Sequence, residues 1–151
     1  MNYFFIEPEV AGGWGKNVVA DVSIHPPQVR KLHYEFEGWM GDALLDTFPC
    51  VIATKEAADA LASEGVTGID YAKVEVSTSD LFRHLHPTLN LPPFVWLQIK
   101  GKAGRDDFGD YCDARGERPW TRHVISDRAL GIIRPFGLNH ADIEPFDAVA
   151  P

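Results

Sequence analysis

The segment GKAGRDDFGDYCDARG, residues 101–116, concentrates carboxylates that could do chemistry, because Asp106, Asp107, Asp110 and Asp113 stand among glycines. Such a segment suits four roles: a metal site, a catalytic acid pair, a docking surface for a basic partner, or a solvated loop. The D-x-[DN]-x-[DN]-G spacing of a calcium loop is absent, and no G-x-x-x-x-G-K-[ST] loop brings a phosphate to a magnesium ion. We therefore expect no metal here. Docking and a solvated loop held by Asp–Arg pairs remain as alternatives.

The histidines and cysteines form no recognisable motif for a metal or a nucleophile. His84 and His86 lie two residues apart on an expected helix, so their side chains point to different faces. No G-x-S-x-G turn is present, and neither Cys50 nor Cys112 has a local catalytic signature. Pairing of a cysteine with a distant histidine stays open. We expect no metal, no cofactor and no catalytic residue.

An enzyme with a site assembled from distant residues is the alternative. Glu35 and Glu37 lie two apart on an expected strand, which places them on one face about 7 Å apart, a spacing that suits an acid and a base. The same glutamates also fit the wet face of an ordinary strand. Other pairs that an enzyme could use are Asp107 with His123, or Glu35 with His33.

Charge favours a protein partner over a nucleic acid. The 151 residues contain 14 basic and 22 acidic residues, a formal charge of −8, which repels phosphate backbones. No Lys or Arg occurs from Leu32 to Thr54, where acidic residues alternate with aromatic ones. Carboxylates speed the encounter with a basic protein, and desolvated rings supply most of the binding energy.

These patterns predict a set of partner-binding residues, all acidic or aromatic, in two stretches of the chain. The set is Asp106, Asp107, Phe108, Asp110, Asp113, Glu35, Glu37 and Trp39.

The expected fold is α+β, a single domain over residues 1–151 with a mixed β-sheet. Alternating or apolar runs predict strands at 3–7, 32–39 and 94–100, the last one central and covered on both faces. Leu32, Tyr34 and Phe36 form the apolar face of the second strand, and His33, Glu35 and Glu37 its wet face. The segment 102–122 lacks clear periodicity and is expected to be either a functional excursion or a mobile loop.

Two stretches, 50–66 and 123–138, follow one pattern of strand, hydroxyl residue, helix and glycine, so each is expected to form a strand-helix-strand unit. Thr54 and Ser126 are the predicted helix N-caps, and glycines close the last turns. A duplication or ordinary helix punctuation would each explain the likeness. Pro135 should end the second helix near Arg134 because it lacks an N–H. The signal S-T-S-D, from Ser77 to Asp80, should open a short additional helix, DLFRHLH, that stops before Pro87.

The compartment follows from the absence of targeting signals. The N-terminal MNYFFIEPEV has no basic leader, and no apolar run approaches the roughly 18 to 20 residues that cross a bilayer. Two cysteines are too few for a disulfide framework. We expect a cytoplasmic protein with reduced thiols and no membrane contact.

The residues carry a resemblance to a known family. YFFIEPEV, GDALLDTFPCVIATKEAADAL, LPPFVWLQIKGKAGRDDFG and HVISDRALGIIRPFGLNHADIEPF together resemble immunity-protein family eleven of bacterial polymorphic toxin systems, formerly a domain of unknown function. The resemblance spans nearly the whole chain. Its motifs are structural, so no catalytic residue is carried over from it.

The resemblance implies an α+β cytoplasmic protein that binds and neutralises a toxin encoded nearby, without catalysing a reaction. The toxin would be basic if it acts on nucleic acid. The stretch GDYCDARGERPWTRH, between Phe108 and Val124, departs from the family pattern and could set which toxin is bound. The alternative is a binding module unrelated to toxins, with a homodimer formed through Trp39 or Trp96.

Overall fold

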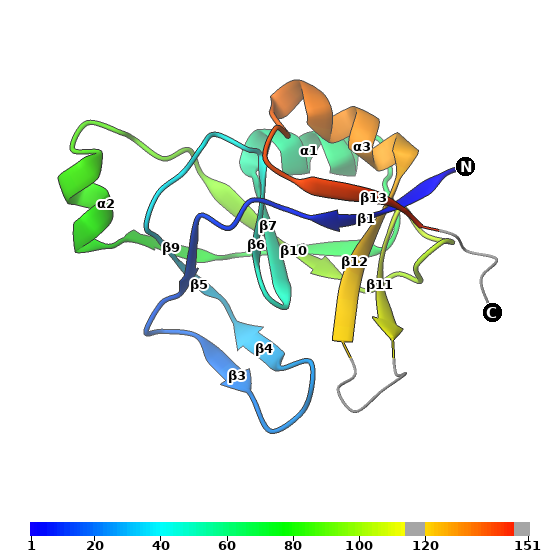
Figure 1. Ribbon diagram of the computed structural model, residues 1–151, viewed down its shortest axis with the longest axis horizontal. Coiled ribbons are helices and arrows are strands. Elements are labelled where there is room, and N and C mark those ends of the chain that lie inside the picture. The colour runs from blue at the N-terminus through cyan, green and yellow to red at the C-terminus, as the bar shows by residue number, and fades with distance from the viewer. Residues whose placement is uncertain (114–119, 147–151) are drawn as a thin grey trace.

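Two antiparallel four-stranded sheets form most of the protein in the computed structural model, which describes residues 1–113 and 120–146 (Figure 1). Sheet A has the order β11-β12-β1-β13, and its strands are β1 (Tyr3–Glu7), β11 (Phe108–Asp113), β12 (Trp120–Ser126) and β13 (Asp142–Phe146). Sheet B has the order β6-β7-β10-β8, with strands β6 (Leu44–Thr47), β7 (Cys50–Thr54), β8 (Ile69–Ala72) and β10 (Phe94–Ile99).

The remaining strands form two small sheets. Sheet C contains β2 (Gly12–Trp14), β5 (His33–Phe36) and β9 (Glu75–Thr78), and β5 runs parallel to β9 but antiparallel to β2. The hairpin of β3 (Val19–Asp21) and β4 (Gln28–Lys31) stands apart at the bottom of Figure 1. The α+β class is confirmed, but the strands divide among four sheets instead of one mixed sheet.

Sheets A and B are connected in the same way. In sheet B the chain passes from β7 through helix α1 (Lys55–Ser63) to β8, and β10 lies between the two strands. In sheet A it passes from β12 through helix α3 (Asp127–Ile133) to β13, and β1 lies between them. The two helices pack side by side along the top of Figure 1.

The predicted caps of both helices are confirmed. The Thr54 hydroxyl accepts a hydrogen bond from the Ala57 N–H, and the Ser126 hydroxyl accepts one from the Ala129 N–H. Each bond satisfies a first-turn donor that has no partner within the helix. Helix α3 ends at Ile133, and the next three residues, Arg134–Phe136, form a 3₁₀ helix, as expected from Pro135.

The short additional helix is confirmed with its predicted start at Asp80, but its N-cap is not Ser77, where the predicted start signal begins. Helix α2 spans Asp80–Leu85, and Ser79 is its cap, with its hydroxyl accepting from the Phe82 N–H. Ser77 belongs to β9 instead, because pairing of β9 with β5 satisfies the backbone there.

The core lies on both faces of β10, so the prediction of a central, doubly covered strand is confirmed. Leu97 packs in one apolar cluster with residues of α1 and α3, and Phe94 and Trp96 pack in a second cluster with residues of sheet C. Trp96 is 6% exposed. The Trp96 side chain therefore offers little surface for the homodimer contact considered from the sequence.

Two sequence-based expectations about strands were wrong. The segment 102–122 was expected to be a functional excursion or a mobile loop, yet β11 begins at Phe108 and β12 at Trp120, and the pairing of these strands supplies order that periodicity did not signal. Residues 114–119 lie outside the described residues. In β5, Tyr34 and Phe36 are buried as predicted, but His33 on the supposed wet face is buried as well.

In the described part of the chain, no helix combines the length and the apolar character needed to cross a membrane.

Candidate functional site

The aspartate segment has a structural role, because the Asp107 side chain joins distant segments by hydrogen bonds; we call such a carboxylate-centred set of hydrogen bonds a tie. Asp107 is 5% exposed, and its carboxylate accepts hydrogen bonds from the Ser126 hydroxyl (2.7 Å), the Thr67 N–H (2.9 Å) and the Arg128 guanidinium (2.9 Å). Burial by itself would raise the pKa of Asp107, but these donors outweigh it and hold the pKa below its usual value. Phe108 is 1% exposed in the core. Asp107 and Phe108 therefore cannot form the predicted docking surface.

The other aspartates of this segment are engaged in the same way or lie outside the description. The Asp106 carboxylate accepts from the Lys102 N–H at 2.7 Å and closes the turn. Gly68, at φ +92°, allows this segment to pack closely against the backbone of residue 68, because a Cβ there would lie 2.0 Å from the Phe108 carbonyl oxygen. Asp110 is bonded to a histidine, and the side chain of Asp113 is outside the described residues. Asp106 is partly exposed and Asp110 is exposed, so docking by Asp106, Asp110 and Asp113 stays a prediction.

His123 is a buried cation between two carboxylates. Its Nδ1 lies 2.6 Å from Asp110 Oδ1, and its Nε2 lies 3.5 Å from Asp46 Oδ1. Burial alone would lower the pKa of His123, but the two carboxylates overcome this effect and raise the pKa to about 9. The imidazole is therefore protonated at neutral pH. The proposed catalytic pair of Asp107 with His123 does not form, because each residue has other partners.

His33 does contact a hydroxyl, but in the wrong tautomer for base catalysis. Its Nε2 lies 2.7 Å from Ser77 Oγ, whereas its Nδ1 accepts a hydrogen bond from the Asn17 N–H at 3.1 Å. In the neutral ring the proton must then be on Nε2, so His33 donates to Ser77 and cannot remove its proton. His33 also lies 3.7 Å from Glu75, and no contact joins it to Glu35 in the described residues. The predicted pair of Glu35 with His33 is wrong.

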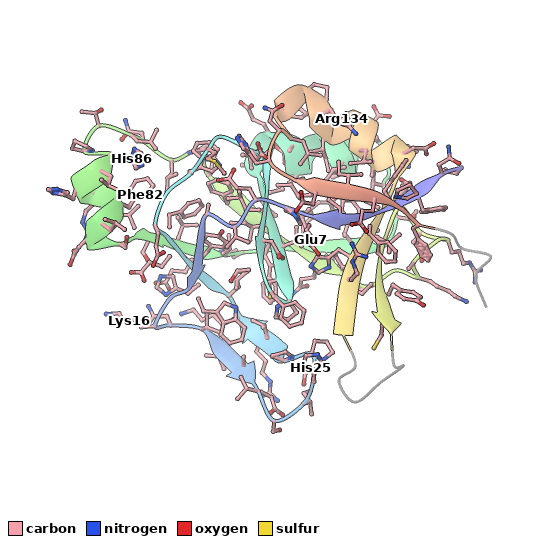
Figure 2. All side chains as sticks on the ribbon, viewed as in Figure 1. Glu7, Lys16, His25, Phe82, His86 and Arg134 are labelled. Atoms are coloured by element: carbon pink, nitrogen blue, oxygen red, sulfur yellow. The ribbon has the colours of Figure 1, made fainter. Side chains whose placement is uncertain are left out.

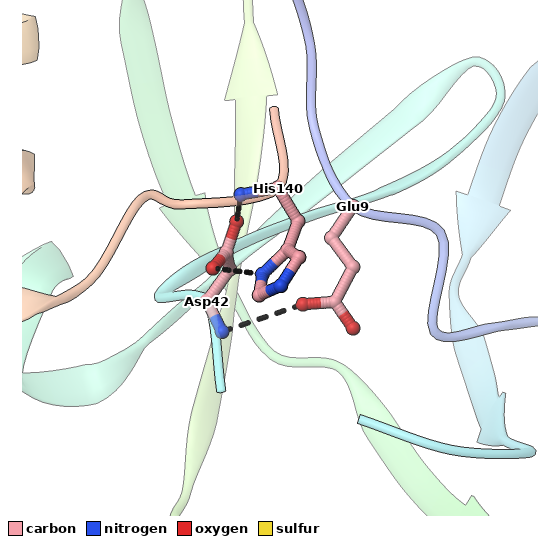
Figure 3. Close-up of side chains that lie close together, drawn as sticks. All are labelled: Glu9, Asp42 and His140. Carbon is pink, nitrogen blue, oxygen red and sulfur yellow. Dashed lines mark hydrogen bonds and ion pairs between the residues drawn. The ribbon is translucent and has the colours of Figure 1, made fainter. Parts of the chain in front are cut away.

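Three residues far apart in the sequence meet in a second tie, which Figure 3 shows. The Glu9 carboxylate accepts from the N–H groups of Met40 (2.8 Å) and Asp42 (3.3 Å). The Asp42 carboxylate accepts from the N–H groups of Asn139 (3.0 Å) and His140 (2.8 Å) and from Nδ1 of the His140 ring (2.9 Å). Burial would raise the pKa of Asp42, but these donors keep it lowered.

This cluster has the composition of a metal ligand set. One ligand atom from each of Glu9, Asp42 and His140 lies within 4.8 Å of the others. However, every carboxylate oxygen of Glu9 and Asp42 already accepts an N–H, so a metal ion would have to replace these bonds. The geometry instead fixes the loop that carries Trp39 and Met40 against the start of the chain. Trp39 Nε1 donates to the Asp42 carbonyl oxygen in the same loop.

A pocket of about 310 Å³ opens beside this tie, between the ends of β1, β6 and β12. Its polar lining comes from residues distant in the sequence: Glu7, Glu9, Asp46, Thr121, Arg122, His123, His140 and Asp142. We call it the carboxylate pocket. Glu7, at the end of β1, is labelled near the middle of Figure 2. Sequence reasoning missed this pocket because no local motif links segments that only the sheet pairing brings together.

Exposed apolar side chains surround the mouth of the pocket. Val10 and Met40, 68% and 62% exposed, line both the carboxylate pocket and a neighbouring hollow that also contains Glu37, Trp39 and Leu81. Phe48, 45% exposed, also lines the carboxylate pocket. We call this surface the docking face; its residues are Val10, Trp39, Met40, Phe48 and Leu81.

Two of the predicted partner-binding residues belong to this region and one does not. Glu37 and Trp39 line the hollow of the docking face. Glu35 lies on β5, opposite Gly13 of β2 and Ser77 of β9, away from that hollow. Val10, Met40, Phe48 and Leu81 were not predicted, since a single exposed apolar residue in a sequence does not differ from a core residue.

The cysteines are free. Cys50 is buried, and burial raises the pKa of its thiol to about 12, so the reactive thiolate is suppressed at neutral pH. Cys112 is exposed on β11.

No protein-family model matches the chain, and no curated protein shows significant similarity to it.

Proposed function

We propose that this chain is a non-catalytic binding protein that neutralises a bacterial toxin in the cytoplasm by covering it with the docking face. The observation that carries the proposal is the docking face itself. Exposed Val10 and Met40 line one hollow together with Phe48 and a second hollow together with Leu81, and carboxylates line both hollows. Exposed apolar side chains grouped beside polar ones are typical of a protein interface.

The rim is acidic. Glu7 and Asp142 line the pocket edge, and Glu37 lines the neighbouring hollow. With the formal charge of −8 over the whole chain, this rim favours a basic partner, since opposite charges speed association and disfavour wrong partners. The resemblance to immunity-protein family eleven agrees in class, because that family neutralises toxins by binding.

The tie between Glu9, Asp42 and His140 supports this role. It anchors the loop of Trp39 and Met40 in one position before the partner arrives. A fixed loop loses less conformational entropy on binding than a mobile one, so more of the contact energy appears as affinity.

The experiment uses the protein encoded beside this chain's gene. We expect that protein to be toxic when expressed alone, to be harmless when this chain is co-expressed, and to form a stable complex with it in calorimetry. The double variant Val10→Ser/Met40→Ser should weaken the complex by about 100-fold, because truncation of two central apolar contacts costs roughly 1 to 2 kcal/mol each.

The matched control is Val19→Ser/Val22→Ser on the β3–β4 hairpin. These valines are 51% and 70% exposed but line neither hollow of the docking face. The control should bind like the wild type. A neighbouring gene product that is neither toxic nor bound, or equal losses from both double variants, would refute the proposal.

A further inference from the structure

We propose that the carboxylate pocket receives one arginine or lysine side chain of the partner, which anchors the complex at the centre of the docking face. This inference rests on the function proposed above and adds the chemistry of the residue that the partner inserts. It is carried by the charge, the unpaired acceptors and the position of the pocket.

The charge of the lining is negative. Its carboxylates are Glu7, Glu9, Asp46 and Asp142, and its cations are Arg122 and the His123 imidazolium, which lies between two carboxylates.

Both cations are already compensated. Arg122 lies 3.3 Å from Glu144 and 4.0 Å from Glu7, and it also stacks over the Phe5 ring. His123 is held by Asp110 at 2.6 Å, a carboxylate that does not line the pocket. The imidazole of His140 is engaged by Asp42. The four lining carboxylates outnumber the two cations, and each cation also has a carboxylate partner outside the pocket, so the lining keeps a net negative charge that attracts a cation and repels an anion.

Two buried acceptor atoms in the lining lack a donor. Asp46 Oδ1 and Thr121 Oγ1 have no hydrogen-bond partner among the described residues. His123 Nε2 lies 3.5 Å from Asp46 Oδ1, an ion-pair contact that is longer than a good hydrogen bond. A buried acceptor without a donor costs free energy, and an inserted guanidinium or ammonium group would supply the missing N–H.

The position of the pocket suits an anchor residue. Val10, Met40 and Phe48 line its mouth and are exposed, so they can pack against the aliphatic stem of an arginine or lysine. The volume of about 310 Å³ leaves room for one such side chain. Interfaces are commonly dominated by a few anchors of this kind near their centre, and arginine is among the most frequent.

The direct test uses small probes with the full chain. Blocked arginine (N-acetyl-arginine-N-methylamide) should shift the amide NMR signals of Thr121, His123 and Met40 saturably, with a dissociation constant in roughly the millimolar range for a single side chain. Blocked norleucine and blocked glutamate should not. The variant Glu7→Gln/Asp142→Asn changes two exposed pocket carboxylates and leaves the buried contacts of His123 in place, so it should fold and bind blocked arginine at least fivefold more weakly.

The matched control is Glu56→Gln/Glu64→Gln, which removes the same charge from α1 and its C-cap, at residues that do not line the carboxylate pocket. It should bind blocked arginine like the wild type. No saturable shift, equal shifts with blocked norleucine, a preference for blocked glutamate, or equal losses in both variants would each overturn the inference.

The two proposals fail in different ways. If the partner complex depends on Val10 and Met40 but blocked arginine does not bind, the toxin-neutralising function stands and the inserted cation is wrong. If blocked arginine binds but the neighbouring gene product does not, the proposed function is wrong. The inference that a side chain of that partner fills the pocket is then wrong as well.

Discussion

Asp107→Ala should lower the free energy of unfolding by about 4 kcal/mol, because it removes a buried charged acceptor from three donors at once. Ser126, Thr67 and Arg128 all donate to this carboxylate, and Arg128 also donates to the carbonyl oxygen of Glu64 at the end of α1. The side chain thus joins β12, α3 and α1 through the loop before β11. Urea unfolding followed by circular dichroism measures the loss as a lower midpoint at unchanged slope.

Asp106→Ala is the matched control, since Asp106 is the neighbouring aspartate and makes one backbone hydrogen bond at a partly exposed site. It should cost only about 1 kcal/mol. The pKa of Asp107 is lowered in the folded state, so its stabilising effect is present above the ordinary value of 3.8 and disappears as the pH falls through the folded pKa. A loss below 1 kcal/mol for Asp107→Ala would contradict the structural role.

The free energy of unfolding of the wild type should fall as the pH rises from 6.5 to about 9, and this fall should be absent from the variant His123→Gln. The folded pKa of His123 is raised from 6.5 to about 9 by Asp110 and Asp46, so the folded state holds a proton that the unfolded state releases. The contribution is complete below pH 6.5 and is lost as the pH rises through 9. A shift of this size corresponds to about 3 kcal/mol.

The measurement is the difference in unfolding free energy between the wild type and His123→Gln, taken at several pH values. The subtraction removes groups that titrate in both proteins. The difference should shrink by about 3 kcal/mol across this range, and NMR should show a protonated His123 ring at pH 8. A difference that stays constant with pH, or a ring that titrates near 6.5, would show that the two carboxylates do not hold the proton.

Local signals in the sequence were sufficient for elements whose structure depends on near neighbours. The caps at Thr54 and Ser126, the end of α3 before Pro135 and the apolar face of Tyr34 and Phe36 were all predicted correctly. Each depends on contacts within about four residues or on strict alternation, which are visible in one dimension. The cap of α2 was misplaced by two residues because Ser77 and Ser79 offer the same hydroxyl and only the pairing of β9 separates them.

The carboxylates show the limit of such reasoning. Asp107 was expected to dock a partner, and its composition and spacing gave no hint that Arg128 and Thr67 would enclose it. Glu9 and His140 belong to no local motif, although they meet at Asp42 beside the candidate site. A charged residue has the same sequence signature whether it faces water or a buried donor, because the donor comes from a distant segment.

The sequence by itself determined an acidic α+β chain, the places where two helices begin, and the strand at the centre of the core. The tertiary structure alone decided which carboxylates are internal ties, which apolar side chains remain exposed, and where a pocket opens between β1, β6 and β12. The reason is physical: helix caps and strand alternation are set by neighbours in the chain, whereas burial and charge pairing are set by strand pairing across more than a hundred residues, such as that of β1 with β12.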